Sequence, residues 1–284
     1  MQRLVPLAIF ALVLSAAVCP AQALRTPEAY YNRGMARLEK GDLEGAAADL
    51  SRAIELFPKF DAAYSGRGKV REAQGDFEGA VSDFTRAIEI NPKNVIAYYS
   101  RGFARLKKQD YDGAIKDFDR ALEAQPNLAI VYDNRGDAKK AKGDAEGALA
   151  DYTKAVEYDP RLAEAYYSRG TVRQERGEVD LAISDYGKTL ELKPQFAEAY
   201  FNRAVLREGK GDLDGAAADY GRVVEINPQY AEAHASLGLI RLAQGRDTEA
   251  QKEFDRALEL DRGIKDSLDQ RIKYAKYQRS KRRP

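Results

Sequence analysis

The sequence contains little of what catalytic and metal-binding proteins use. Its 284 residues include one Cys, one His and no Trp. Hydrolytic and metal sites need several converging His, Cys or carboxylate side chains, and no His or Cys cluster at metal-ligand spacing occurs. No glycine-rich phosphate loop follows a strand-like segment either. We therefore expect a protein that is not an enzyme, with no catalytic residue, metal, cofactor or small-molecule substrate.

An excess of one charge is also missing. Lys and Arg number 46 and Asp and Glu 45, so the formal net charge is +1. A balanced chain has no bulk attraction to polyphosphates, and we expect no nucleic acid partner. Basic residues cluster only at the end, at Arg279 and in the tail of residues 280–284. We interpret this cluster as solvated, and contact with an anionic surface is the alternative.

One long apolar run stands at the N-terminus. An Arg precedes the apolar residues 4–18, and a small-x-small site ends at Ala23. This is the pattern of a signal peptide, so residues 1–23 are predicted to direct export to the periplasm or envelope of a bacterium. The run is short for a membrane span, which favours cleavage after Ala23. Membrane contact is expected only under two alternatives, an uncleaved anchor or lipidation of Cys19.

From Pro27 onward the sequence repeats itself every 34 residues. The seven copies are residues 27–60, 61–94, 95–128, 129–162, 163–196, 197–230 and 231–264. Apolar residues return at spacings of three and four on both sides of a Gly-Asp break, so each copy is predicted to be two helices. In the first copy Gly41 can end one helix and Asp42 can cap the next. Gln109 and Arg246 depart from this pattern, and their turns are predicted to be less ideal.

The same small and aromatic residues return at fixed places of each copy. In the first copy Gly34 and Ala46 allow close helix approach, Tyr30 and Leu50 fill the space between the helices, and Pro58 ends the second helix. This pattern resembles the tetratricopeptide repeat (TPR) family over residues 27–264. The resemblance implies an all-α fold, a right-handed superhelical solenoid of helix pairs. The apolar stripe after the last copy predicts a capping helix over residues 265–279.

The resemblance also implies where a partner would bind. In this family the first helices line a concave groove that suits extended protein segments. We expect the groove residues to be Tyr31, Asn32, Tyr99, Asn134, Tyr167, Phe201 and Asn202. Asn can bond a peptide backbone, and Tyr offers a rigid apolar face with a polar tip. The alternative is that these aromatic side chains only cover neighbouring helices.

A cation replaces the family's usual apolar residue at the seventh place of most copies. The cations are Arg33, Arg67, Arg101, Arg135, Arg169 and Arg203, and the second helices carry a recurrent acid at Asp49, Asp83, Asp117, Asp151, Asp185 and Asp219. We predict a charge ladder of Arg-carboxylate pairs that fixes the helix register, with glycines such as Gly45 making room for the long side chains. The alternative is a basic ribbon for a phosphate or a glycan.

These observations favour a non-catalytic scaffold or adaptor that binds a protein or peptide segment in the groove. The alternative function is a structural subunit that self-associates, as a homo-oligomer, or packs into a larger envelope complex through its end repeat and convex face. A concentration-dependent mass would separate the two.

Overall fold

The computed structural model describes residues 26–281. The predicted signal peptide and the last three residues lie outside the described residues. Every regular element from residue 26 to residue 281 is a helix, and none of these helices is both long and apolar enough to cross a membrane. The all-α fold predicted from the sequence is confirmed.

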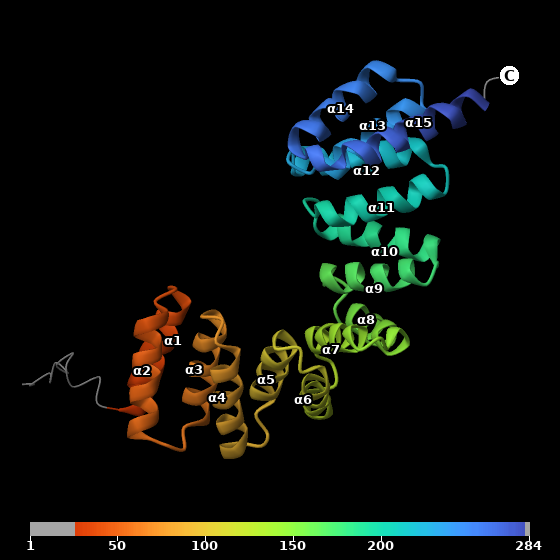
Figure 1. Ribbon diagram of the computed structural model, residues 1–284. Helices are drawn as coiled ribbons and strands as arrows, with labels where there is room; N and C mark the ends of the chain where they lie inside the picture. Colours follow the sequence, from red (N-terminus) through yellow and green to blue (C-terminus); the bar gives the residue numbers. More distant parts are fainter. Residues whose placement is uncertain (1–25, 282–284) are drawn as a thin grey trace, which may run out of the picture. The chain divides into compact units, whose positions relative to one another are not determined.

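The described residues form two compact units, residues 26–108 and residues 109–281. The first contains α1 (Pro27–Glu39), α2 (Leu43–Leu56), α3 (Asp61–Ala73), α4 (Phe77–Ile90) and α5 (Val95–Lys107). The second contains α6 (Tyr111–Ala124), α7 (Ala129–Ala141), α8 (Ala145–Tyr158), α9 (Ala163–Glu175), α10 (Val179–Leu192), α11 (Ala197–Gly209), α12 (Leu213–Ile226), α13 (Ala231–Ala243), α14 (Asp247–Leu260), a 3-10 turn (Arg262–Ile264) and α15 (Lys265–Lys281). Each odd-numbered helix from α1 to α13 begins at the first residue of a 34-residue copy. Within the units, Figure 1 shows α1 and α3 beside their successors in the first unit, and α7, α9, α11 and α13 beside theirs in the second.

Aspartate caps set the start of most second helices. The Asp42 carboxylate accepts a hydrogen bond from the Gly45 N–H at 2.9 Å, which satisfies one of the free donors of the first turn. A side chain at position 45 would place its Cβ 2.2 Å from the Asp42 Oδ2 atom. Gly45 therefore makes room for the cap, and the Arg37 guanidinium donates to the Gly45 carbonyl at 3.1 Å. An added Cβ at Gly79 would also lie 2.9 Å from the Arg71 Cδ atom, so this glycine makes room for a long arginine as well as for its cap.

The two unusual turns differ from each other. Gln109 takes the left-handed glycine position of its turn with φ 62°, a conformation that strains a residue with a side chain. In the last repeat Gly245 supplies the left-handed residue with φ 83°, and Arg246 stands at the cap position without accepting a hydrogen bond from a backbone N–H of the helix. Its guanidinium instead donates to the Glu249 carboxylate of α14 at 2.7 and 2.6 Å.

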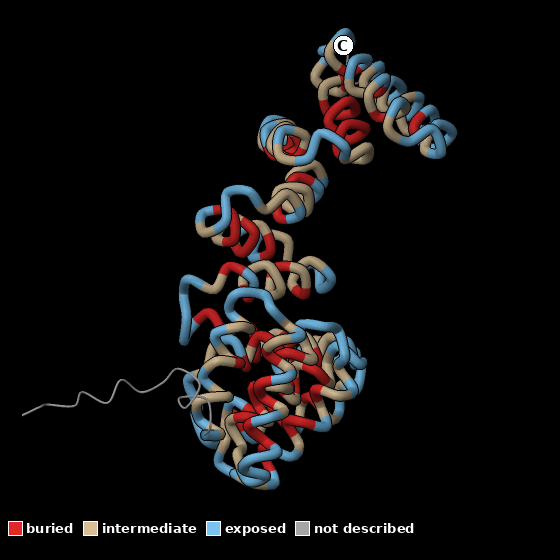
Figure 2. The backbone as a smooth tube through the Cα atoms, turned by 90° about the vertical axis from the view of Figure 1, so that its left-hand side faces the viewer, coloured by how far each residue is buried: buried red, intermediate tan, exposed pale blue. Residues whose placement is uncertain are grey.

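Within each unit the core runs between the paired helices and from one repeat to the next. Ala46 and Leu50 of α2 are fully buried together with Val70 of α3. A Cβ added at Gly68 would lie 2.7 Å from the Phe84 ring, so the small residues are needed for this helix spacing. Figure 2 shows the buried residues gathered where the helices face one another.

The chain's last described helix, α15, covers α13. Leu268 is buried there, and Ile272 and Ala275 pack against the same cluster. The helix continues to Lys281, two residues past the predicted end. Arg279 does not belong to a solvated tail, because its guanidinium donates to the Leu242 carbonyl and pairs with Asp247, each at 2.9 Å.

Candidate functional site

The first helices of successive repeats contact one another. Contacts join α1 to α3, α3 to α5, α7 to α9 and α13 to α15. In each unit by itself we call the side that carries the first helices its first-helix surface, made by α1, α3 and α5 in the first unit and by α7, α9, α11 and α13 in the second. The two surfaces hold all of the predicted groove residues.

Three predicted groove residues of the second unit form a structured wall. The Asn202 side-chain amide on α11 donates to the Tyr167 hydroxyl on α9 at 3.1 Å. The Tyr167 ring lies 4.7 Å from Phe196, and the Phe201 ring stacks 5.1 Å from Tyr230. These side chains are half-buried, and burial raises the pKa of Tyr167. They therefore hold neighbouring repeats together and also contribute part of their surface to the wall.

The other predicted groove residues differ in how exposed they are and in what they contact. Asn32 is exposed, while the Tyr31 ring packs 5.2 Å from Phe60. Asn134 is only 7% exposed, and its amide donates to the Ile130 carbonyl of its own helix at 3.0 Å. Tyr99 lines a hollow on the first unit. Of this group, Asn32 and Tyr99 are the residues best placed to meet a ligand.

The hollow beside Tyr99 has a volume of about 400 Å³. It lies between α3 and α5 and is lined by Lys69, Glu72, Ile96, Tyr99, Ser100 and Phe103. Ile96 is 59% exposed and presents apolar surface at the side of the hollow. Burial raises the pKa of Glu72, and the charges of Lys69 and Lys107 oppose the shift. The hollow offers an apolar wall with charged groups at its edge.

Sequence reasoning missed the exposed apolar residues of this surface. Ile96, Ile130 and Val205 are 59%, 42% and 39% exposed. They stand at the second and ninth places of their repeats, counted from the first residue of each copy. The available signal was clearest at the second place, where Ile96 and Ile130 stand and the other copies carry Glu or Ala. At the ninth place other copies also carry apolar residues, so Val205 gave no signal.

A second hollow of about 850 Å³ lies at the end of the second unit. Leu239 and Ile240 of α13 and Leu213 of α12 contribute apolar lining, and α15 forms one side with Tyr274, which is 65% exposed. Glu208 of α11 lies on the opposite side and accepts a hydrogen bond from the Tyr220 hydroxyl at 3.0 Å. The capping helix thus contributes to a second possible binding surface.

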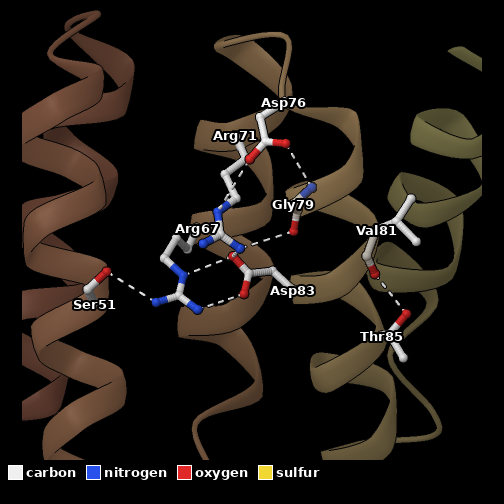
Figure 3. A network of polar contacts seen from close by, with 8 residues as sticks. All are labelled: Ser51, Arg67, Arg71, Asp76, Gly79, Val81, Asp83 and Thr85. Atoms are coloured by element: carbon white, nitrogen blue, oxygen red, sulfur yellow. Dashed lines mark hydrogen bonds and ion pairs between the residues drawn. The ribbon is translucent and has the colours of Figure 1, made fainter. Parts of the chain in front are cut away.

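The charged residues between the paired helices form close contacts. The Arg67 Nε and Nη2 atoms donate to the two Asp83 oxygens at 2.9 and 2.7 Å, and Arg71 adds a bond of 2.7 Å to the same carboxylate (Figure 3). Arg67 also donates to the Ser51 hydroxyl of the preceding repeat at 3.1 Å. Its bond with Asp83 raises the pKa of Arg67.

The same arrangement recurs along both units. The pairs are Arg33–Asp49, Arg67–Asp83, Arg135–Asp151, Arg169–Asp185 and Arg203–Asp219. Arg101 lies in the first unit and Asp117 in the second. In the last repeat Leu237 replaces the arginine, and Glu253 contacts His234 and Arg241 instead.

Aromatic rings add to these pairs. Six of the ladder arginines lie over a tyrosine of the same helix, with the guanidinium carbon between 5.2 and 5.7 Å from the ring centre. Guanidinium groups that already contact a carboxylate and a ring within the fold have few donors left to bind a phosphate or a glycan. The contacts favour the structural ladder over the basic ribbon.

A buried acid interrupts the aromatic wall on α7. Asp133 is 5% exposed, and its Oδ1 atom has no hydrogen-bond partner. Burial, Asp137 and Glu164 raise the pKa of Asp133 to about 7. One turn further on, Asp137 accepts a hydrogen bond from the Tyr152 hydroxyl at 2.7 Å. Among residues 26–281 no group of three or more His, Cys, Asp or Glu side chains is arranged to hold a metal ion.

Family models match most of this helical array. Models described as "Tetratricopeptide repeat" match residues 27–60, 65–129 and 231–263, and a model described as "TPR repeat" matches residues 136–175 and 209–245. The chain belongs to the tetratricopeptide repeat family. The TPR assignment made from the 34-residue period is confirmed.

Solved TPR structures share the fold. MamA is 30% identical, with a TM-score of 0.53 over 57% of this chain and 94% of MamA. YrrB, described as a TPR protein with an unusual peptide-binding site, is 23% identical, with a TM-score of 0.54 over 65% of this chain and 95% of YrrB. The pilF protein of Pseudomonas aeruginosa is 18% identical, with a TM-score of 0.65 over 71% of this chain and 92% of that protein. No curated protein sequence matches the chain.

Proposed function

We propose that this TPR protein is a non-catalytic scaffold that holds an extended segment of a protein partner on its first-helix surface. The observation that carries the proposal is the hollow between α3 and α5, where Ile96 and Phe103 meet Lys69 and Glu72. Protein segments are commonly held by apolar pockets with a few polar groups at the edge. A large aliphatic side chain that is 59% exposed beside such a hollow is well suited to contact an apolar side chain of a partner.

The relatives support this class of function. MamA and YrrB belong to the same fold, and YrrB has a peptide-binding site by its description. The stacked repeats also provide several adjacent positions for one extended chain, since each first helix adds a similar surface. A partner is therefore expected to contact more than one repeat.

Export to the bacterial periplasm or envelope is part of the same proposal. It depends on the predicted signal peptide of residues 1–23 and on the absence of Cys from the remaining chain, which needs no oxidant to fold. Cell fractionation of the full chain, with mass determination of the N-terminus, tests it. A mature protein that begins at Leu24 in the periplasmic fraction is the expected result, and an uncleaved cytoplasmic chain contradicts it.

Capture of a partner tests the scaffold function. The chain from Leu24 is immobilised and exposed to an envelope extract, beside an Ile96→Ser, Phe103→Ser variant. A matched control, Tyr158→Ser with Leu181→Ser, removes apolar side chains that are 45% and 49% exposed on the second helices α8 and α10. We expect the unmutated chain and the control to capture the same protein, and the Ile96, Phe103 variant to lose it.

Two results would count against the scaffold. Equal capture by all three chains would remove the first-helix surface from the interaction. A mass that grows with concentration, with no captured protein, would favour the self-associating structural subunit. Circular dichroism of each chain excludes loss of folding as the cause.

A further inference from the structure

We propose that the second unit binds a Lys or Arg side chain of its protein partner at Asp133 on α7, so that the bound segment is basic at this point. The inference rests on the proposed scaffold function and names the chemistry that this part of the first-helix surface recognises.

Asp133 is a buried polar group with an unused acceptor. Its side chain is 5% exposed, and among the described residues its Oδ1 atom has no donor. Leaving such a group unsatisfied costs free energy, so native structures rarely retain one without a reason. Four other copies carry an aromatic residue at this place, and the remaining two carry Ser65 and Ala235, so a carboxylate is not needed to complete the repeat.

The surroundings of Asp133 are acidic. Asp137 and Glu164 lie near enough to raise its pKa, and Glu198 and Glu208 continue along α11. Glu198 is exposed.

Cations on and beside this part of the surface already contact acids of the fold. Lys140 contacts Glu175 at 2.9 Å and the Thr171 hydroxyl at 3.0 Å, and Lys193 contacts Glu164. Arg271 of α15 contacts Glu232 at 2.7 Å. No Lys or Arg of residues 26–281 forms an ion pair with Asp133 or Glu198 in the structure. The surface therefore has a local excess of negative charge that a basic segment would offset.

A cationic side chain fits this place better than the other ligands of a carboxylate. A metal ion would need several ligands together, and the described residues do not form such a group. A neutral donor could satisfy the Oδ1 atom but would bring no positive charge to the surrounding acids. Lys and Arg bring both a donor and a charge, and Ile130, 42% exposed one turn before Asp133, offers apolar surface to their aliphatic stems.

Fluorescence anisotropy with a defined probe tests the inference. The probe is a fluorescein-labelled peptide of alternating Gly and Lys, and its neutral counterpart carries acetyl-lysine in place of Lys. The chain from Leu24 is compared with Asp133→Asn and with the charge-matched control Glu191→Gln, whose side chain on α10 pairs with Lys188. We expect the Lys peptide to bind in preference to the acetylated one, and Asp133→Asn to weaken its binding about tenfold or more.

The control separates a site from general charge attraction. Equal weakening by Asp133→Asn and Glu191→Gln, or equal binding of both peptides to the unmutated chain, would overturn the inference. Asn has nearly the shape of Asp, and thermal unfolding of the variant verifies that it is folded.

The captured partner provides a second and independent readout. Loss of the partner by the Asp133→Asn chain supports the inference. Full capture by Asp133→Asn overturns it and leaves the scaffold function standing. If no chain captures a protein, the scaffold function fails, and the peptide measurement alone decides whether Asp133 binds a cation.

Discussion

Arg67 and Asp83 face each other across one repeat, with both carboxylate oxygens bonded to one guanidinium at 2.7 and 2.9 Å. The Asp83 side chain is 3% exposed, whereas Arg67 and Arg71 retain 20% and 32% of their surface. The acid is thus the buried partner, and two cations at the edge of the core compensate it. Removing the acid and removing one cation should therefore have different effects.

The Asp83→Ala variant is expected to lose about 3–5 kcal/mol of unfolding free energy, because it leaves two guanidinium groups without their carboxylate. Urea unfolding followed by circular dichroism measures the loss. Glu89→Gln is the control, since its pair with Arg86 is exposed and contributes little. Similar unfolding of the two variants would show that the ladder does not stabilise the fold.

Asp133→Asn should stabilise the protein at neutral pH and not at acid pH. The folded-state pKa of about 7 lies above the ordinary 3.8, so between pH 4 and 7 the folded chain keeps a proton that the unfolded chain has released. The unfolding free energy of the parent chain therefore falls as pH rises through this window. The Asp133→Asn side chain does not titrate, so the unfolding free energy of the variant does not fall for this reason. The difference in unfolding free energy between variant and parent should be small near pH 4 and reach a few kcal/mol, as an order of magnitude, above pH 7. A pH-independent difference would contradict the raised pKa.

Gln109→Gly should raise the unfolding free energy. Gln109 adopts φ 62°, and relief of the left-handed strain, of about 1–2 kcal/mol, exceeds the extra flexibility of glycine in the unfolded chain. We expect a net gain of about 0.5–1 kcal/mol in urea unfolding. The reciprocal change Gly75→Gln, at φ 79° with no atom within 4 Å of the added Cβ, should lose stability for the same reason. Opposite signs for the two variants are the decisive result.

Arg279→Ala should loosen the end of α15. Arg279 bonds the Leu242 carbonyl and the Asp247 carboxylate, and it anchors the last turns of a helix whose one buried residue is Leu268. Amide hydrogen exchange in the last turns of α15 is expected to become faster, while exchange around Leu268 stays slow. Lys273→Ala, on the same helix, is the control. Unchanged exchange in Arg279→Ala would mean that these two contacts do not hold the helix end.

The repeat pattern made the fold predictable. A Gly at the helix-helix contact, an Asp cap and a closing Pro each have a local mechanism, and they return in phase, so helix starts such as Pro27 and Asp61 could be read from the sequence. The ion pairing of first-helix arginines with second-helix aspartates could also be predicted, because the acid and the cation recur together in the copies.

Details that depend on the stacking of repeats could not be predicted in the same way. The bond between Tyr167 and Asn202 joins residues 35 positions apart, and it requires the rise between neighbouring helices. The burial of Asn134 and the exposure of Ile96 depend on neighbours from other helices. Arg279, at the end of the predicted capping helix, was interpreted as solvated because a run of cations has no periodic pattern, and its contacts lie 32 and 37 residues earlier.

The bond from Arg67 to Ser51 has a consequence for how the array melts. One arginine joins α2, α3 and α4, and Arg135 likewise reaches Asp119 of the preceding repeat at 2.6 Å. In a linear array, folding of each repeat depends on its own energy and on the energy of the boundary with its neighbour. The seventh-place arginines contribute both to the energy of their own repeat and to the energy of its boundary with the preceding repeat. Loss of one such arginine thus weakens a boundary as well as a repeat, and allows the array to fray into segments that melt separately.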